Sequence, residues 1–182
     1  MKNTTFKITL TAILSALALI TFLIESLFPP LFIPGARLGL ANLFILLAII
    51  FLGVKYAGIV FLIKIVLGSI LSGNLSSIMY SFPAGTISFI LQVLLIKYCS
   101  SYFSITAISA LSAVVNNTVQ NCVYVLVTST PSLFIYLPYL VLLGLVAGFT
   151  IGITTCLICK ILPKKFLDTL SFEGEINESQ KR

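Results

Sequence analysis

The sequence predicts an all-α protein that crosses a lipid bilayer six times, and three observations lead to this fold class. Hydrophobic residues make up 59% of the 182 residues and charged residues only 9%, whereas soluble domains carry roughly one quarter charged residues. The mean hydropathy is +1.15. The apolar runs at residues 8–23, 40–52 and 133–146 are continuous, which favours helices over the alternating strands of a membrane β-barrel.

Breaker residues divide the chain into six predicted helices, which cover residues 8–28, 40–52, 59–71, 78–97, 103–127 and 133–162. Pro29-Pro30 ends the first helix, because proline cannot continue a helix. A loop rich in proline and glycine then runs to Gly39. The turn at Gly53–Gly58 and the polar loop at Ser72–Ser77 separate the next helices. Pro138 marks either a kink in the sixth helix or a late start of it.

The distribution of basic residues predicts the orientation of this bundle. With six crossings, Arg37 stands alone on one side, and the basic residues on the other side are Lys2, Lys7, Lys55, Lys97, Lys160, Lys164 and Lys165. Lysine and arginine favour the cytoplasmic side, so both termini are predicted to be cytoplasmic and the protein to lie in the plasma membrane. The net charge of +6 therefore reflects membrane topology and does not indicate nucleic-acid binding. We predict one transmembrane domain over residues 1–163 and a charged cytoplasmic tail over residues 164–182.

Three charged residues stand at places where lipid would make them costly. Glu25 lies in the last turn of the first predicted helix, Lys64 lies in the middle of the third, and Arg37 lies in an outward loop. Charged groups at membrane depth usually line a pocket or pair with one another. Two kinds of interpretation therefore stand side by side. These residues border an outward-facing pocket, or their role is structural: Glu25 pairs with Arg37 or Lys64 to hold the fold, or Lys64 snorkels to the interface.

The fifth predicted helix carries the densest polar cluster, made of Asn116, Asn117, Gln120 and Asn121. At about 100° per residue these four amides share one face, and Ser112 and Tyr124 extend the face at intervals of four residues. Interhelical hydrogen bonds would explain some of them. Because four neighbouring amides offer many donors and acceptors, we favour a pocket for a polar solute.

Small residues form two ladders that let helices approach closely. Ala12 and Ala16 form one on the first helix, where a partner protein could dock. Gly144, Gly148 and Gly152 form another on the sixth, where internal packing is the favoured interpretation. The pair Cys156-x-x-Cys159 lies in an apolar helix without a second pair or any histidine, so it is interpreted as packing. No metal or cofactor is predicted.

This combination of features resembles the substrate-binding (S) subunits of energy-coupling factor (ECF) transporters. That resemblance implies six helices with cytoplasmic termini, an outer pocket and a lid formed by the loop at 29–39. It also implies docking of Ala12 and Ala16 on a transmembrane coupling subunit that works with two ATPases. The chain has no Gly-x-x-x-x-Gly-Lys loop of its own for a nucleotide.

A closer resemblance is to small bacterial membrane proteins labelled heptaprenyl diphosphate synthase component I, or Gx transporter. The matching stretches are Pro34-Gly-Ala-Arg-Leu-Gly-Leu-Ala-Asn42, the loop from Ser72 with Tyr80-Ser81, and Asn116-Asn-Thr-Val-Gln120. The resemblance adds Asn42 and Tyr80 to the candidate binding residues. The resemblance also implies a histidine at the position of Asn116. Because this chain has asparagine there, the site lacks that titratable group.

Two functions follow from these predictions. The first is a solute-binding membrane subunit of an ECF-type uptake system, in which Arg37 and Lys64 would suit an anionic solute such as a vitamin or isoprenoid precursor. The alternative is a non-catalytic membrane subunit that assists the catalytic subunit of a prenyl diphosphate synthase. Such synthases hold Mg²⁺ and diphosphate with clusters of carboxylates. Glu25 is the only carboxylate before Asp168, so the chain is not predicted to be an enzyme by itself.

Overall fold

The computed structural model describes residues 2–27, 39–100 and 102–161, and all regular secondary structure in these ranges is helical. The elements in chain order are α1 (Lys2–Leu27), α2 (Asn42–Leu52), α3 (Val54–Leu71), α4 (Ser77–Cys99), α5 (Ile105–Thr128), the 3-10 helix η1 (Pro131–Tyr136) and α6 (Leu137–Ile161). The predicted all-α class is confirmed for this part of the chain. The predicted tail at 164–182, and the predicted lid loop at 29–39 apart from Gly39, lie outside the described residues.

The predicted turn at Gly53–Gly58 proves to be the single residue Gly53, because α2 ends at Leu52 and α3 begins at Val54. Gly53 has a φ of 88°, a left-handed value that glycine adopts without the clash a Cβ would cause. Its N–H donates to the carbonyl oxygens of Ala48 and Ile49, so it caps α2 while it starts α3. One glycine therefore reverses the chain between two helices.

The sixth predicted helix begins later than the apolar pattern indicated. The 3-10 helix η1 occupies the first residues of the predicted span, and Pro138 is the second residue of α6. A proline in the first turn removes only an N–H that has no helical partner there. The structure therefore agrees with a late start of the sixth helix at Pro138 and not with a kink within it.

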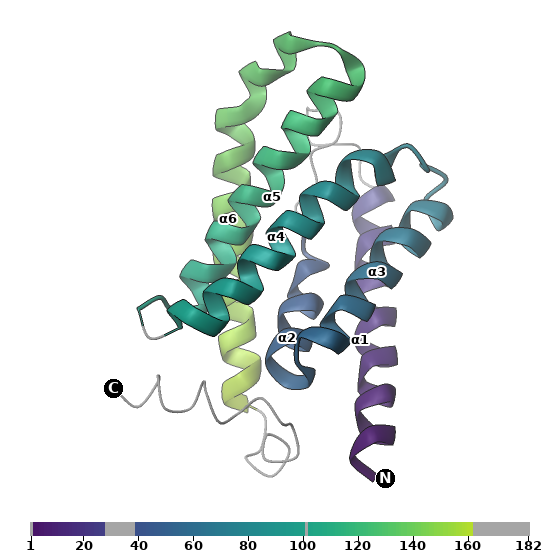
Figure 1. Cartoon of the computed structure of the whole chain (residues 1–182), viewed down its shortest axis with the longest axis vertical. Helices are drawn as coiled ribbons and strands as arrows, with labels where there is room; N and C mark the ends of the chain where they lie inside the picture. The colour runs from purple at the N-terminus through teal and green to yellow at the C-terminus, as the bar shows by residue number, and fades with distance from the viewer. Residues whose placement is uncertain (1, 28–38, 101, 162–182) are drawn as a thin grey trace.

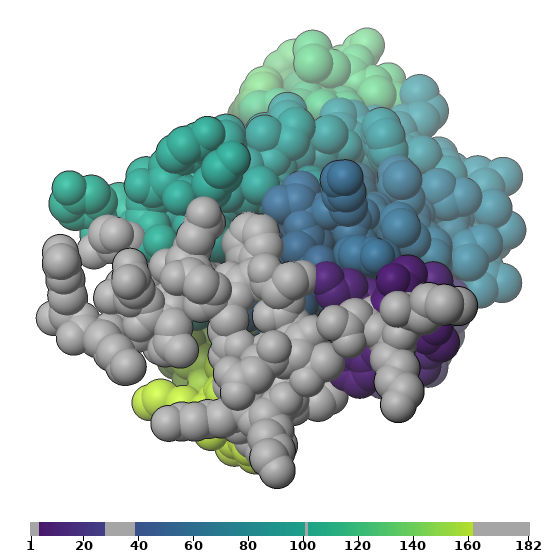
Figure 2. All heavy atoms as spheres, turned by 60° about the horizontal axis from the view of Figure 1, so that its bottom comes forward, coloured from purple at the N-terminus to yellow at the C-terminus, as the bar shows by residue number. Residues whose placement is uncertain are grey.

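Within the described ranges, five helices are apolar and long enough to cross a bilayer, namely α1, α3, α4, α5 and the continuous unit of η1 and α6. The sixth apolar helix, α2, has 11 residues and is about 16 Å long at 1.5 Å per residue. Figure 1 shows successive helices running in opposite directions, with α2 beginning near the mid-height of the bundle. The start of α1 and the end of α6 lie at the same end of the molecule, which Figure 2 brings forward.

The helices form two groups of three. The first group contains α1, α2 and α3, and the second contains α4, α5 and α6. Packing is extensive within each group and much sparser between them, where α2 contacts α6 and α3 contacts α4. The boundary between the two groups is therefore the least densely packed interface of the bundle.

Glycines bring α5 and α6 into backbone contact. A Cβ added at Gly148 would lie 2.5 Å from Cα of Ala110, and one at Gly152 would lie 2.5 Å from Cα of Thr106. At Gly144 it would lie 3.1 Å from the carbonyl oxygen of Ala113. The predicted role of this ladder in internal packing is confirmed.

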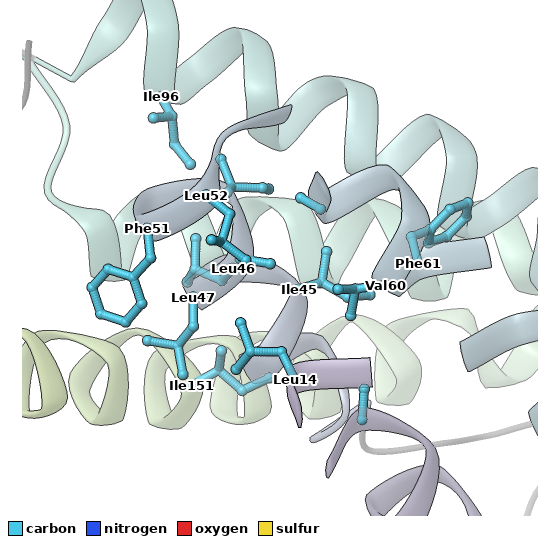
Figure 3. Packing of buried hydrophobic residues seen from close by; sticks show 14 of the residues in the cluster. Leu14, Ile45, Leu46, Leu47, Phe51, Leu52, Val60, Phe61, Ile96 and Ile151 are labelled. Atoms are coloured by element: carbon cyan, nitrogen blue, oxygen red, sulfur yellow. The ribbon is translucent and has the colours of Figure 1, made fainter. Parts of the chain in front are cut away.

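The apolar core centres on α2, whose residues from Ile45 onwards are almost all buried. Figure 3 shows Leu46, Leu47 and Leu52 of α2 surrounded by side chains from the other helices, among them Leu14, Ile96 and Ile151. Beyond its first turn, the short helix thus joins the two groups through contacts between apolar side chains. Its first turn lies beside a small cavity with polar lining residues.

Candidate functional site

A small cavity lies where α2, α3, α4, α5 and α6 meet. Its volume is about 20 Å³, which is room for one water molecule. The polar lining residues are Asn42 of α2, Ser88 and Gln92 of α4, and Ser109, Ser112 and Asn116 of α5. The apolar lining residues are Ile45, Phe61, Gly85, Phe89, Ala113 and Ile151. Among the described residues, the lining therefore offers amides and hydroxyls together with two aromatic rings, and no charge.

Several of these polar groups lack a protein partner. The hydroxyl of Ser112 is fully buried and makes no hydrogen bond within the described chain. Gln92 is only 7% exposed, and its amide is not hydrogen-bonded to any other described residue. A buried polar group without a partner costs about 1–3 kcal/mol. The cavity is therefore a place where a bound molecule with donors and acceptors would stabilise the protein.

A buried cation stands beside the cavity. Lys64 of α3 is 8% exposed, and its Nζ donates a hydrogen bond of 2.6 Å to Oδ1 of Asn42. Asn42 is the first residue of α2, so the ammonium is held at the N-terminal end of that helix. The preceding Gly39 has a φ of 74°, and a Cβ there would lie 3.0 Å from Nδ2 of Asn42. Glycine at this position lets the amide take its place between the ammonium and the cavity.

Glu25, a second charged candidate, is not among the residues that line the cavity. The carboxylate of Glu25 accepts a hydrogen bond from the backbone N–H of Leu40, which ties the end of α1 to the residues just before α2. Arg37 lies outside the described residues. Glu25 therefore holds the entry to α2 in place, whereas Lys64 and Asn42 border the site itself.

The four amides of α5 divide between different roles. Asn116 lines the cavity, whereas Nδ2 of Asn117 donates a 3.0 Å hydrogen bond to the carbonyl oxygen of Leu140 on α6. Gln120 and Asn121 are buried beyond the cavity lining, and Nδ2 of Asn121 has no hydrogen-bond partner in the ranges described. Of these four amides, only Asn116 lines the cavity, together with Ser112 one turn before it.

Tyr80 likewise serves to join helices. Its ring meets the ring of Tyr124 edge to face, with centroids 5.3 Å apart, so it links α4 to α5 outside the cavity lining. Gln92 and Ser88 are lining residues that the sequence analysis missed. Their spacing of four residues on α4 was the available signal, and it matches the interval between Ser112 and Asn116 on α5.

The small-residue ladder on α1 faces outward. Ala12 and Ala16 are both exposed, and so are the large neighbours Ile13, Leu17 and Ile20. Internal packing therefore does not account for this face, in contrast to the glycines of α6. Cys156 and Cys159 are free thiols, and no group of three or more His, Cys, Asp or Glu residues within the described ranges is placed to hold a metal ion.

Comparison with known proteins identifies a family. Residues 14–158 match the sequence model of the family described as heptaprenyl diphosphate synthase component I. This stretch contains the cavity and all its lining residues. No curated protein and no solved structure matches the chain.

Proposed function

The chain belongs to the heptaprenyl diphosphate synthase component I family, and from this premise we propose that it is a non-catalytic, solute-binding membrane subunit of an ECF-type uptake system. The observation that carries the proposal is the cavity with its unpaired hydroxyl at Ser112 and its buried amide at Gln92. Ligand sites are typically apolar pockets with a few well-placed polar groups. The first turn of α2 and the Lys64–Asn42 pair border this pocket.

A catalytic role in prenyl transfer has little support in the residues themselves. Diphosphate bound through Mg²⁺ requires several oxygen ligands on one site. Glu25 is the only carboxylate between residues 1 and 167, and it is bonded to the backbone of Leu40. The chemistry named in the family description would therefore belong to another subunit.

The proposal includes six crossings with both termini in the cytoplasm. Successive helices alternate in direction (Figure 1), so Lys55 at the start of α3, Lys97 at the end of α4 and Lys160 at the end of α6 fall at the end where the chain begins. Basic residues gather on the cytoplasmic side of plasma-membrane proteins. In this topology the short α2 crosses part of the bilayer, and its first turn faces the solute at mid-depth.

The solute site has a direct test. Replacing Gln92 and Asn116 together by leucine removes two lining amides while keeping side chains of similar size. We expect the purified variant to lose at least nine tenths of any small molecule that is released from the wild-type protein by denaturation and measured by mass spectrometry. Thr150→Val, on an exposed face of α6, serves as the control and should retain it. Full retention by the double variant would rule out this site.

The partner has a second test. We expect Ala16→Leu to reduce co-purification of a transmembrane coupling subunit and its ATPases from native membranes at least tenfold, because a bulky side chain prevents close approach of helices. Val146→Leu, at a 65% exposed position on α6, should leave it unchanged. Undiminished association of Ala16→Leu would refute docking on this face.

The family description itself favours one other candidate function. In that alternative the chain assists a soluble prenyl diphosphate synthase, and the cavity holds part of a prenyl chain. The same pull-down separates the two candidates. Recovery of an aspartate-rich prenyl synthase, without a coupling subunit, would favour the biosynthetic role.

A further inference from the structure

The size of the cavity sets a problem for any solute. A volume of about 20 Å³ accommodates one water molecule, whereas pockets for small molecules measure roughly 300–1,000 Å³. A solute can therefore bind only if a side chain that now fills the site gives way. The lining shows which side chain that is.

Phe61 is the large side chain that enters the site from the other helix group. It belongs to α3, and its ring contacts the rings of Phe82 and Phe89 and approaches Gly85, all three on α4. Contacts between the two helix groups are sparse. The packing of the Phe61 ring against α4 is therefore one of the contacts that hold α3 and α4 together beside the cavity.

The position of the Phe61 ring, called the slot below, is defined by Phe89 and Gly85 of α4. It stacks on Phe89 with ring centroids 5.5 Å apart and planes inclined by 15°. The floor of the slot is Gly85, where an added Cβ would lie only 2.7 Å from Cε2 of Phe61. Glycine at position 85 is what allows the ring to approach the backbone of α4 so closely.

The edge of the slot is polar and uncharged. Ser88 and Gln92 lie on the same helix as Gly85 and Phe89, and Ser112 and Asn116 line the cavity from α5. Ser88 is already committed to the carbonyl oxygen of Ser112 at 2.8 Å. The hydroxyl of Ser112 has no partner in the described chain, and Gln92 keeps both donors and an acceptor available beside the slot.

We propose that Phe61 is a placeholder for the solute: a planar ring bearing an uncharged hydrogen-bonding group takes its position, stacked on Phe89 over Gly85 and bound at its edge by Gln92, Ser112 and Asn116. This inference rests on the proposed solute site and adds the class of molecule that enters it. The Phe61 ring must leave the slot when such a molecule binds, which loosens the interface between the two helix groups.

The test uses Phe61→Ala in the full-length protein in detergent, with four probes that differ in one property each. Benzamide is planar and carries a neutral amide, benzoate is planar and anionic, toluene is planar and apolar, and cyclohexanecarboxamide keeps the amide on a puckered ring. We expect Phe61→Ala to bind benzamide at least tenfold more tightly than the wild-type protein does, and at least tenfold more tightly than it binds each other probe, by calorimetric titration.

Phe82→Ala is the matched control. The ring centroid of Phe82 lies 6.4 Å from that of Phe61, but Phe82 is 42% exposed and does not line the cavity. It should gain no benzamide binding. If Phe61→Ala does not fold, Phe61→Leu keeps apolar volume without a ring and should rank the probes in the same order.

Three results would overturn the inference. Equal binding of toluene would mean that an ordinary apolar void had been made, and preference for benzoate would mean that the edge selects an anion. Absence of benzamide binding by a folded Phe61 variant would mean that the slot is not a solute position. These failures are distinguishable from failure of the proposed function, which is judged by the solute released from wild-type protein and lost in the Gln92 and Asn116 variant.

Discussion

Gly148→Ala is expected to lower the free energy of unfolding by about 2–3 kcal/mol, the cost of forcing extra volume into a packed helix interface. The added methyl group would lie 2.5 Å from Cα of Ala110 and 2.8 Å from the carbonyl oxygen of Ser109. Both atoms belong to the backbone of α5, so no side chain can rotate away to make room. The two helices must move apart, which also disturbs the cavity wall at Ser109.

The control for this substitution is Gly58→Ala on α3, where nothing lies within 4 Å of the added Cβ. Alanine is the better helix former by about 1 kcal/mol, so this variant should be unchanged or slightly more stable. Denaturant titration in mixed micelles measures both. Equal stabilities of the two variants would show that α5 and α6 do not pack through Gly148 as described.

The apolar pattern was sufficient to predict the helices because membrane helices must satisfy their own backbone hydrogen bonds. The pattern was less informative about helix boundaries that depend on a single residue. The turn at Gly53 needed only a single left-handed glycine, which a composition pattern of several residues cannot specify. The start of the last helix was likewise set by η1, which has the same apolar character as α6.

The site was predicted in part, for a physical reason that the α5 amides illustrate. Helical periodicity places Asn116 and Asn117 on one face, yet the two residues face different neighbours, the cavity and the carbonyl oxygen of Leu140. Which neighbour an amide meets depends on how α4 and α6 pack against α5. The same holds for Gln92, which becomes a candidate only when α4 is placed beside Ser112.

The pair of Lys64 and Asn42 shows most clearly what the sequence could not predict, because 22 positions separate the two residues along the chain. Both were candidate site residues, but the sequence left open whether Lys64 pairs, snorkels or faces a solute. The structure brings its ammonium to the amide at the start of α2. A pairing of this kind depends on the tertiary approach of α2 and α3, which a periodic pattern does not encode.

Removing the amide of Asn42, which is the acceptor of this pair, is expected to have the second large effect on stability. Asn42→Leu should lower the free energy of unfolding by about 2–3 kcal/mol, since hydrogen bonds to charged groups are worth about 1.5–3 kcal/mol and the buried Lys64 loses an acceptor. Lys64→Met should cost less, because it removes the charge itself. The double variant should be more stable than the sum of the two losses predicts, by about 1–3 kcal/mol.

The comparison of these four proteins in one denaturant series separates a structural pair from a binding one. Additive losses would mean that Lys64 and Asn42 do not interact in the folded protein. Lys97→Met, at an exposed lysine near the end of α4, removes the same charge without a buried partner and should change stability by less than about 0.5 kcal/mol. If the double variant regains stability yet no longer releases the solute found in the wild-type protein, then the pair supports the fold and also forms one wall of the site, because only the second role requires its polar atoms.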